Sequence, residues 1–228
     1  MTGTRFFTNA QCKEDSVKVP FFDNESCCAE VEPVPPVSCI PLDPFTLCNP
    51  SFEGTPVFNN GNDFDPNMQC WRQFANTTPD ILPVQGFITV PANNGLTYVG
   101  LASGGLPPDT YLPGEGIWQQ LPFVLRTDLT YFFNIDIIEL TDQIWSPGFG
   151  YGVLEVWGGN TNGQMDELLW TSPVINQGTV WIPFLVTFTP VLATHTYLFF
   201  RFSRTAGTSC YIGIDNMSEI QTICVEQS

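Results

Sequence analysis

Few side chains in this sequence are placed to perform catalysis. The one histidine, His195, lies between two threonines in a segment with a strand-like pattern, and the motifs G-x-S-x-G and H-E-x-x-H are absent. Three acidic residues, Asp136, Glu139 and Asp142, stand close enough together to raise the question of a glycosidase carboxylate pair. Spacings of three along a strand place successive side chains on opposite faces, so a solvated edge explains these residues better. We therefore expect a protein that is not an enzyme.

The cysteines indicate disulfides. Zinc is the alternative, but C-x-x-C pairs are missing, the adjacent Cys27 and Cys28 are a poor chelating pair, and histidines are lacking. Connectivity stays open, because eight cysteines allow about 105 pairings. The residues expected to form disulfides are Cys12, Cys27, Cys28, Cys39, Cys48, Cys70, Cys210 and Cys224.

Net charge excludes one class of function. The 228 residues include 23 acidic and 7 basic side chains, which gives a formal charge of -16. Nucleic-acid binding requires lysine and arginine to replace the counterions of the phosphates, and this chain would repel phosphate instead. No window of about 18 apolar residues occurs, so no membrane span is expected.

The cysteine content also bears on localisation. Eight cysteines are typical of an oxidising compartment, yet residues 1–16 have no apolar stretch of signal-peptide length. Three explanations stay open: a signal removed before residue 1, reduced cysteines, or oxidation after the chain leaves its cell. A virion component fits the third, so we expect an extracellular or virion-surface protein.

Composition divides the chain near residue 48. Residues 1–48 hold five cysteines and a proline-rich run, and their apolar residues are too irregular to build a core. We expect this segment to be an extended arm, stapled by disulfides, that lies on the main domain or on a neighbouring subunit. A flexible linker is the alternative.

Residues 49–228 have the pattern of short strands. In the segment 131–138, apolar residues alternate with others at a period of two, and the segments 181–190 and 195–203 repeat this pattern. Glycine- and asparagine-rich turns separate the strands, and no helical pattern intervenes. The sequence therefore predicts an all-β protein whose domain, residues 49–228, is an antiparallel β-sandwich.

Several motifs, taken in order, resemble those of the jelly-roll carbohydrate-binding modules of the galactose-binding-like superfamily. The early tryptophan Trp71 is similar to the core tryptophan of that family, and the resemblance covers the chain from residue 49 onward. It implies a jelly roll whose first and last strands lie side by side. The other segments that carry it are Asn49–Glu53 (NPSFE), Gly95–Leu101 (GLTYVGL), Glu115–Leu121 (EGIWQQL), Trp181–Pro190 (WIPFLVTFTP) and Tyr211–Met217 (YIGIDNM).

The resemblance also implies a structural calcium ion. In these modules the ion lies between the first and last strands, and Glu53 and Asp215 occupy the matching positions. Calcium binds six to eight hard oxygen ligands, and two carboxylates from distant strands would otherwise repel each other. The alternative, that both carboxylates bond only turn amides, stays open.

Adjacent first and last strands would also favour particular disulfides. Cys48 with Cys224 is then a reasonable pair, and Cys70 with Cys210 is a second. The remaining four cysteines would staple the arm.

Members of this family commonly bind sugars, and aromatic side chains are the raw material for that function. A pyranose presents an apolar side to an aromatic ring, while polar groups bind its hydroxyls. Arg201 with Tyr197 and Phe199 forms a further outward stripe. The alternative is that these aromatics pack against the arm or against neighbouring subunits. The candidate glycan-binding residues are Trp118, Trp145, Tyr151, Trp157 and Trp181.

Two hypotheses follow from the sequence. The first is a non-enzymatic surface or structural subunit, of a virion or an extracellular assembly, that joins copies of itself through the arm and presents a carbohydrate-module-like domain. The second is a dedicated carbohydrate-binding adhesion module of a secreted protein. The partners expected are copies of the chain or other surface subunits, and glycans.

Overall fold

A computed structural model describes residues 39–104, 114–144, 150–207 and 209–225. Cys39–Ser228 form one compact unit. The expectations for Cys12, Cys27, Cys28 and Trp145 lie outside the described residues. Among the described residues, no helix has both the length and the hydropathy that a membrane crossing requires.

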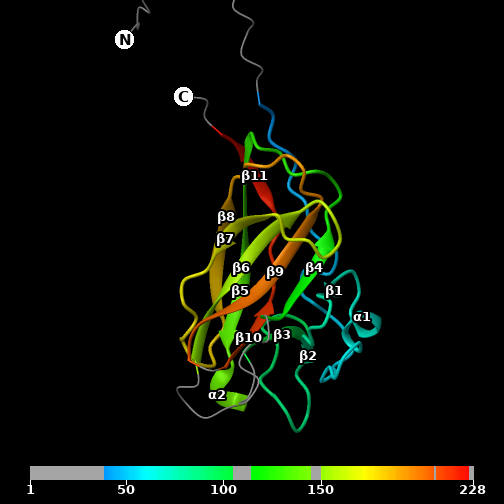
Figure 1. Cartoon of the computed structure of the whole chain (residues 1–228), viewed down its shortest axis with the longest axis vertical. Helices are drawn as coiled ribbons and strands as arrows, with labels where there is room; N and C mark the ends of the chain where they lie inside the picture. The colour runs from blue at the N-terminus through cyan, green and yellow to red at the C-terminus, as the bar shows by residue number, and fades with distance from the viewer. Residues whose placement is uncertain (1–38, 105–113, 145–149, 208, 226–228) are drawn as a thin grey trace, which may run out of the picture. The chain divides into compact units, whose positions relative to one another are not determined.

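The unit is built almost entirely from antiparallel strands (Figure 1), which confirms the predicted β-sandwich. Two single-turn helices interrupt the strands, α1 (Phe64–Asn67) and α2 (Thr141–Ile144). The strands are β1 (Arg72–Gln73), β2 (Asp80–Leu82), β3 (Tyr98–Ser103), β4 (Gly116–Gln120), β5 (Leu129–Glu139), β6 (Gly150–Gly159), β7 (Glu167–Thr171), β8 (Ile182–Phe188), β9 (Tyr197–Gly207), β10 (Cys210–Asp215) and β11 (Gln221–Cys224).

The strands form two sheets. The five-stranded sheet has the order β1-β4-β9-β6-β7. In the six-stranded sheet, β8 pairs with one edge of β5, while β10 and β11 follow one another along its other edge, and β3 and β2 continue outward from β10. Strands that are distant in sequence therefore lie next to each other in both sheets.

The main core lies between the sheets and follows the predicted alternation. On β5 the residues Tyr131, Phe133 and Ile135 are buried in this core, whereas Asn134 between them is exposed. On β8, Phe184, Val186 and Phe188 are likewise buried, and the residues between them are exposed. The period of two thus identified the inward faces of these strands correctly.

A second, smaller core covers the outer face of the six-stranded sheet. Tyr98, Ile138 and Tyr211 point away from the main core but are buried, because the segment 84–92 packs over them. Trp181 packs against this cluster as well. The outer face of this sheet is thus partly closed to solvent.

The compact unit begins at Cys39, earlier than the expected boundary near residue 48. The backbones of Phe45 and Ile220 exchange two hydrogen bonds, of 3.0 and 2.8 Å, and Leu47 is buried in the main core. Residues 39–48 are therefore part of the sandwich.

The two disulfides of the described residues differ from the expected pairs. Cys39 bonds Cys224, and Cys48 bonds Cys70, so the expected pairs Cys48–Cys224 and Cys70–Cys210 are wrong. The bridge between Phe45 and Ile220 explains the first difference. Because the two segments run antiparallel, the residues before Phe45 approach the residues after Ile220, which brings Cys39 toward Cys224. Cys48 follows Phe45, so the chain carries it away from Cys224.

Cys210 is a buried free thiol, which corrects its assignment as a disulfide cysteine. It lies opposite Ser103 in the pairing of β10 with β3, and its Sγ is 3.6 Å from the Ser103 carbonyl oxygen. Burial raises the pKa of the Cys210 thiol to about 12. The side chain therefore packs as a small apolar group.

Candidate functional site

The outer face of the five-stranded sheet carries a row of aromatic side chains across three neighbouring strands. Trp118 of β4 lies opposite Phe199 of β9, and Phe199 lies opposite Trp157 of β6. The neighbours of each in sequence, such as Ile117 and Phe200, are buried in the main core. Alternation then directs the row outward.

Tyr197 extends this row along β9. Its ring centroid is 5.5 Å from that of Trp118 and 6.3 Å from that of Phe199. Phe199 is fully buried, with Phe74 against its other side, whereas Trp118, Trp157 and Tyr197 are half-buried. We call Trp118, Trp157, Tyr197 and Phe199 the aromatic face. Phe199 forms its floor, and the other three rings reach solvent.

Two consecutive glycines allow rings to lie directly on the backbone of β6. A Cβ atom at Gly159 would lie 2.8 Å from the Phe199 ring, and one at Gly158 would lie 2.6 Å from the His195 ring. Real side chains do not approach that closely. Gly159 therefore allows the Phe199 floor of the aromatic face to form, and Gly158 leaves room for the His195 ring.

A polar pair fixes one end of the aromatic face. Oε2 of Glu155 accepts hydrogen bonds from Nε1 of Trp157 and from Nε of Arg201, both at 2.8 Å. The guanidinium carbon of Arg201 lies 5.0 Å from the centroid of the Trp157 ring, which adds a cation–π contact. The Trp157 indole is thus held by both its N–H group and its ring face.

The indole of Trp118 is anchored as well. Its Nε1 donates a hydrogen bond of 3.1 Å to the carbonyl oxygen of Gln73 on β1. With both indole N–H groups bonded inside the protein, the rings are oriented before any ligand arrives. A preorganised face costs less ordering entropy when a ligand binds.

A buried pair lies beside the aromatic face, where β9 begins. Nε2 of His195 is 2.7 Å from Oε2 of Glu167, and Glu167 also accepts backbone hydrogen bonds from Val191 and Leu192. Burial acts to raise the pKa of Glu167, but these hydrogen bonds outweigh it and lower that pKa below its ordinary value. The pair fixes the loop after β8 against the sheet.

The structure separates the predicted glycan-binding residues. Trp118 and Trp157 come together on the aromatic face. Tyr151 has the same outward direction on β6 but lies at the far end of that strand, and it is exposed. Trp181 directly precedes β8 of the other sheet. Its ring centroid lies 5.1 Å from that of Tyr98, and its Nε1 donates a hydrogen bond to the Pro91 carbonyl oxygen.

Sequence reasoning missed three residues that support the aromatic face: Phe74, Gln73 and Glu155. Gln73 belongs to a strand of two residues, and Phe74 follows it directly; this stretch is too short to show a period. The outward direction of Glu155 was predictable, because it lies two residues before Trp157 on β6 and therefore points to the same face. Its pairing with Arg201 depends on strand order, which the sequence does not give.

Glu53 and Asp215 lie on either side of the segment 93–97, as expected for first and last segments that meet. The backbone N–H of Leu96 donates to both carboxylate oxygens of Glu53, at 3.0 and 3.2 Å. The backbone N–H groups of Asn93 and Asn94 donate to Oδ2 of Asp215, each at 2.8 Å. Burial raises the pKa of Asp215 to about 6.

These bonds bear on how well the site fits calcium. Turn amides bond both carboxylates, which was the alternative to an ion. Each carboxylate oxygen keeps a second lone pair, but two carboxylates supply fewer than the six to eight oxygens that calcium needs. Among the described residues, no group of three or more His, Cys, Asp or Glu side chains is placed to hold a metal ion. Backbone carbonyls would have to complete the shell, and calcium stays a prediction.

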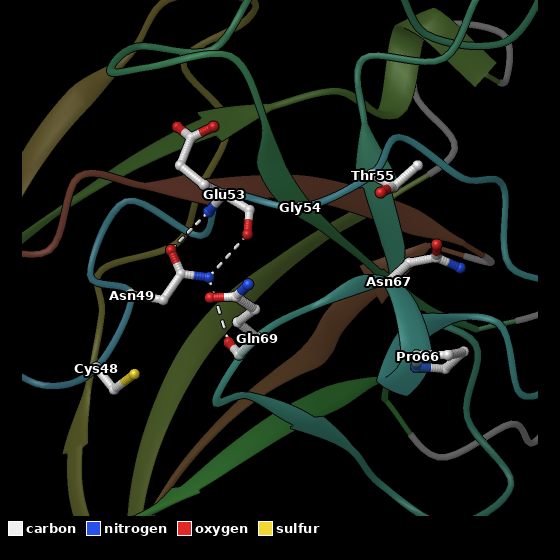
Figure 2. Close-up of a pocket in the computed structure, with 8 residues that line it drawn as sticks. All are labelled: Cys48, Asn49, Glu53, Gly54, Thr55, Pro66, Asn67 and Gln69. Carbon is white, nitrogen blue, oxygen red and sulfur yellow. Dashed lines mark hydrogen bonds between the residues drawn. The ribbon is translucent and has the colours of Figure 1, made fainter.

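A polar hollow of about 490 Å³ lies beside Glu53 (Figure 2). Asn49 closes one wall: its side chain bonds the backbone of Glu53 and the carbonyl oxygen of Gln69. Figure 2 shows the Glu53 carboxylate pointing away from Asn49. The residues that line the hollow carry no aromatic ring. The hollow therefore lacks the flat apolar surface that the aromatic face offers.

No protein-family model and no curated protein matches the sequence. Solved structures do match. A cyclase from Fischerella sp. TAU aligns with 81% of this chain and 99% of its own at 16% identity, with a TM-score of 0.54. The CBM22-1 xylan-binding domain of Paenibacillus barcinonensis Xyn10C aligns with 75% of this chain and 94% of its own at 12% identity, with a TM-score of 0.43.

A CBM4 structure aligns with 78% of this chain at 14% identity, over 100% of its own length and with a TM-score of 0.42. The structures similar to this chain therefore include carbohydrate-binding-module domains. At these identities the similarity concerns the fold alone, and the match to the cyclase, with a TM-score above 0.5, supports it.

Proposed function

We propose that this protein is a non-enzymatic, carbohydrate-binding surface protein and that glycans bind to the aromatic face. One observation carries the proposal. Trp118 and Trp157 flank Phe199 on adjacent strands, and both indoles are held in place by hydrogen bonds of 2.8 to 3.1 Å. Rigid aromatic rings on an open sheet are suited to the apolar sides of sugar rings.

The spacing of the face fits an oligosaccharide. Neighbouring strands are about 4.8 Å apart, so the backbones at Trp118 and Trp157, separated by β9, are about 10 Å apart. Successive sugar rings of one chain can then rest on the two indoles and on Tyr197 between them. Arg201 lies at the edge of the face, and its guanidinium has five N–H donors, of which Glu155 does not use all. The remaining donors can bond sugar hydroxyls.

The polar groups of the face support a role in binding. Glu155, the carboxylate beside the rings, accepts hydrogen bonds from both Trp157 and Arg201. This carboxylate therefore positions the two side chains that shape the face. The similarity to a cyclase does not extend the proposal to catalysis, because a fold hosts many activities.

The proposed location is extracellular or on a virion surface. The two disulfides support an oxidising environment. As part of the same proposal, residues 1–38 join copies of the chain into a surface assembly, as their composition predicts. The Cys39–Cys224 disulfide supports this role, because it fastens the segment that follows the arm to the last strand of the sandwich.

A glycan array tests the proposed function directly. The full chain should bind a group of related glycans, and Trp118→Ala and Trp157→Ala should each weaken binding at least about tenfold, as expected for central aromatic contacts. Tyr151→Ala is the matched control, since it removes an exposed aromatic from β6 outside the face. A silent array, or equal losses in the control, would reject the proposal.

A further inference from the structure

The longest stretch without charge in this acidic chain lies in its second half. From Leu168 to Phe200 there is no Asp, Glu, Lys or Arg, although the chain has 23 acidic and 7 basic residues. The stretch begins in β7, contains all of β8 and reaches into β9. All 30 charged side chains therefore lie outside it.

The part of this stretch that includes β7 and β8 forms one side of the sandwich. β7 is the last strand of the five-stranded sheet, and β8 pairs only with β5 in the six-stranded sheet, among the strands that the structure describes. The two strands lie against each other and are adjacent in Figure 1. Each therefore has one edge whose backbone N–H and C=O groups are not paired in a sheet.

This side is apolar as well as uncharged. Along β8, Leu185 points outward and is 59% exposed, while Phe184 and Val186 point into the core. Val191, just after β8, is 77% exposed. We call this surface the uncharged edge. Its exposed apolar residues are Leu168, Val174, Val180, Leu185, Val191 and Leu192.

Soluble proteins usually protect such an edge with charged side chains, lysine above all, because a flat apolar edge pairs with other strands. Along β8 such charged side chains are missing from a chain of charge -16, and Pro183 is the residue that limits pairing there. Two copies of so acidic a protein repel each other over most of their surfaces. The uncharged edge is where a second copy can approach without that repulsion and bury apolar area.

We infer that the occupant of the uncharged edge is a second copy of this chain, bound by antiparallel pairing of β8 with β8 of that copy. An isologous dimer needs a self-complementary patch, and an uncharged strand edge meets this need. The pairing joins two six-stranded sheets into one continuous sheet. It does not depend on glycan binding, because the aromatic face lies on the other sheet.

Pro183 limits this pairing, because it removes one hydrogen-bond donor from the free edge. A proline in an edge strand turns its nitrogen toward the free edge, so the backbone groups of Leu185 and Thr187, two and four residues further along, point the same way. We place the two-fold axis at Leu185, the middle of the strand, so that the two Leu185 residues face each other. Thr187 of each copy then lies opposite Pro183 of the other, which accepts but cannot donate a hydrogen bond. Their Cα atoms would be about 5.5 Å apart in a hydrogen-bonded pair.

Two measurements on the full chain test the inference. Sedimentation equilibrium should show a monomer–dimer equilibrium that tightens as salt screens the net charge. Leu185→Lys should weaken the dimer at least tenfold, because it places like charges opposite each other. Val124→Lys is the matched control: Val124 is 45% exposed, lies outside the uncharged edge, and undergoes the same change of charge. Leu185→Cys should form an intermolecular disulfide under mild oxidation, and Val124→Cys should not.

Each other outcome overturns the inference. A chain that stays monomeric at concentrations on the order of 100 μM has no such dimer. Equal weakening by Leu185→Lys and Val124→Lys would show a general effect of charge. A dimer that survives Leu185→Lys uses another surface. Slow exchange of the β8 edge amides in a strict monomer would show that residues of the same chain cover the edge.

Discussion

The hydroxyl of Tyr211 donates a hydrogen bond of 2.5 Å to the carboxylate of Asp80 inside the protein. Asp80 is only 3% exposed, and its other oxygen accepts the backbone N–H of Asn59 at 2.7 Å. Burial is the largest influence on this carboxyl and raises its pKa from 3.8 to about 7. Burial raises the pKa of Tyr211 as well, so the tyrosine stays neutral and remains a donor.

This relationship predicts how stability depends on pH. Since the pKa of Asp80 is higher in the folded than in the unfolded chain, the folded state binds more protons between about pH 4 and 7. The free energy of unfolding therefore falls as pH rises through this window. Asp80 alone accounts for a fall in the free energy of unfolding on the order of 4 kcal/mol, since each unit of pKa shift corresponds to about 1.4 kcal/mol. Urea denaturation at a series of pH values measures this slope.

Asp80→Asn is the control for that slope. The variant cannot ionise at this position, so its unfolding free energy should decline less between about pH 4 and 7. A residual slope should remain, because burial also raises the pKa of Glu115 and raises that of Asp215 to about 6. A variant with the same pH dependence as the unaltered protein would show that Asp80 does not titrate in this window.

The Cys39–Cys224 disulfide should stabilise the sandwich strongly, because it links residues 185 positions apart. The double variant Cys39→Ser/Cys224→Ser should lose about 2–5 kcal/mol of unfolding free energy. Cys210→Ser, which removes a free thiol, should leave the number of disulfides unchanged. Peptide mapping without reduction tests the pairs, and recovery of Cys48 linked to Cys224 would contradict the structure.

Calcium binding between Glu53 and Asp215 predicts a response to chelation. If the site binds calcium, then EDTA should lower the melting temperature and excess calcium should restore it, with a gain of about 2.7 kcal/mol at a hundred times the dissociation constant. Glu53→Gln should remove the response. An unchanged melting temperature in EDTA would leave the turn amides as the sole partners of these carboxylates.

Deleting residues 1–38 tests the role of the arm. The compact unit begins at Cys39, so the truncated chain should keep a melting temperature within a few degrees of that of the full chain. A deletion through residue 47 should be far more harmful, because it removes Leu47 from the core and breaks the disulfide at Cys39.

Light scattering separates two modes of assembly in this truncated chain. Loss of assemblies larger than a dimer would support the arm as their connector. The dimer through β8 should persist. Assemblies of unaltered size would reject the role of the arm.

The fold could be predicted from the sequence because the alternation of apolar residues along each strand indicates which side of the strand is buried. Tyr131, Phe133 and Ile135 show the period of two that a half-buried strand requires, and the core confirms them. The disulfides were not accessible, because the pair Cys39–Cys224 depends on the register set by one bridge, between Phe45 and Ile220. The spacing of the cysteines in the sequence does not indicate that register.

The candidate site was accessible in part. The outward direction of Trp157 and of the stripe through Phe199 follows from alternation. Their meeting with Trp118 depends on the order β4-β9-β6, which joins strands distant in sequence. Trp181 has a similar local pattern, yet it packs in the second core, where the segment 84–92 covers its sheet.

The most direct test of the central claim is a calorimetric titration of the full chain with soluble oligosaccharides of the class that the array selects. The account predicts saturable binding that Trp118→Ala and Trp157→Ala each weaken at least about tenfold while Tyr151→Ala leaves it unchanged. Binding that both tryptophan variants retain at full strength would contradict the account, because the glycan would then rest on another surface.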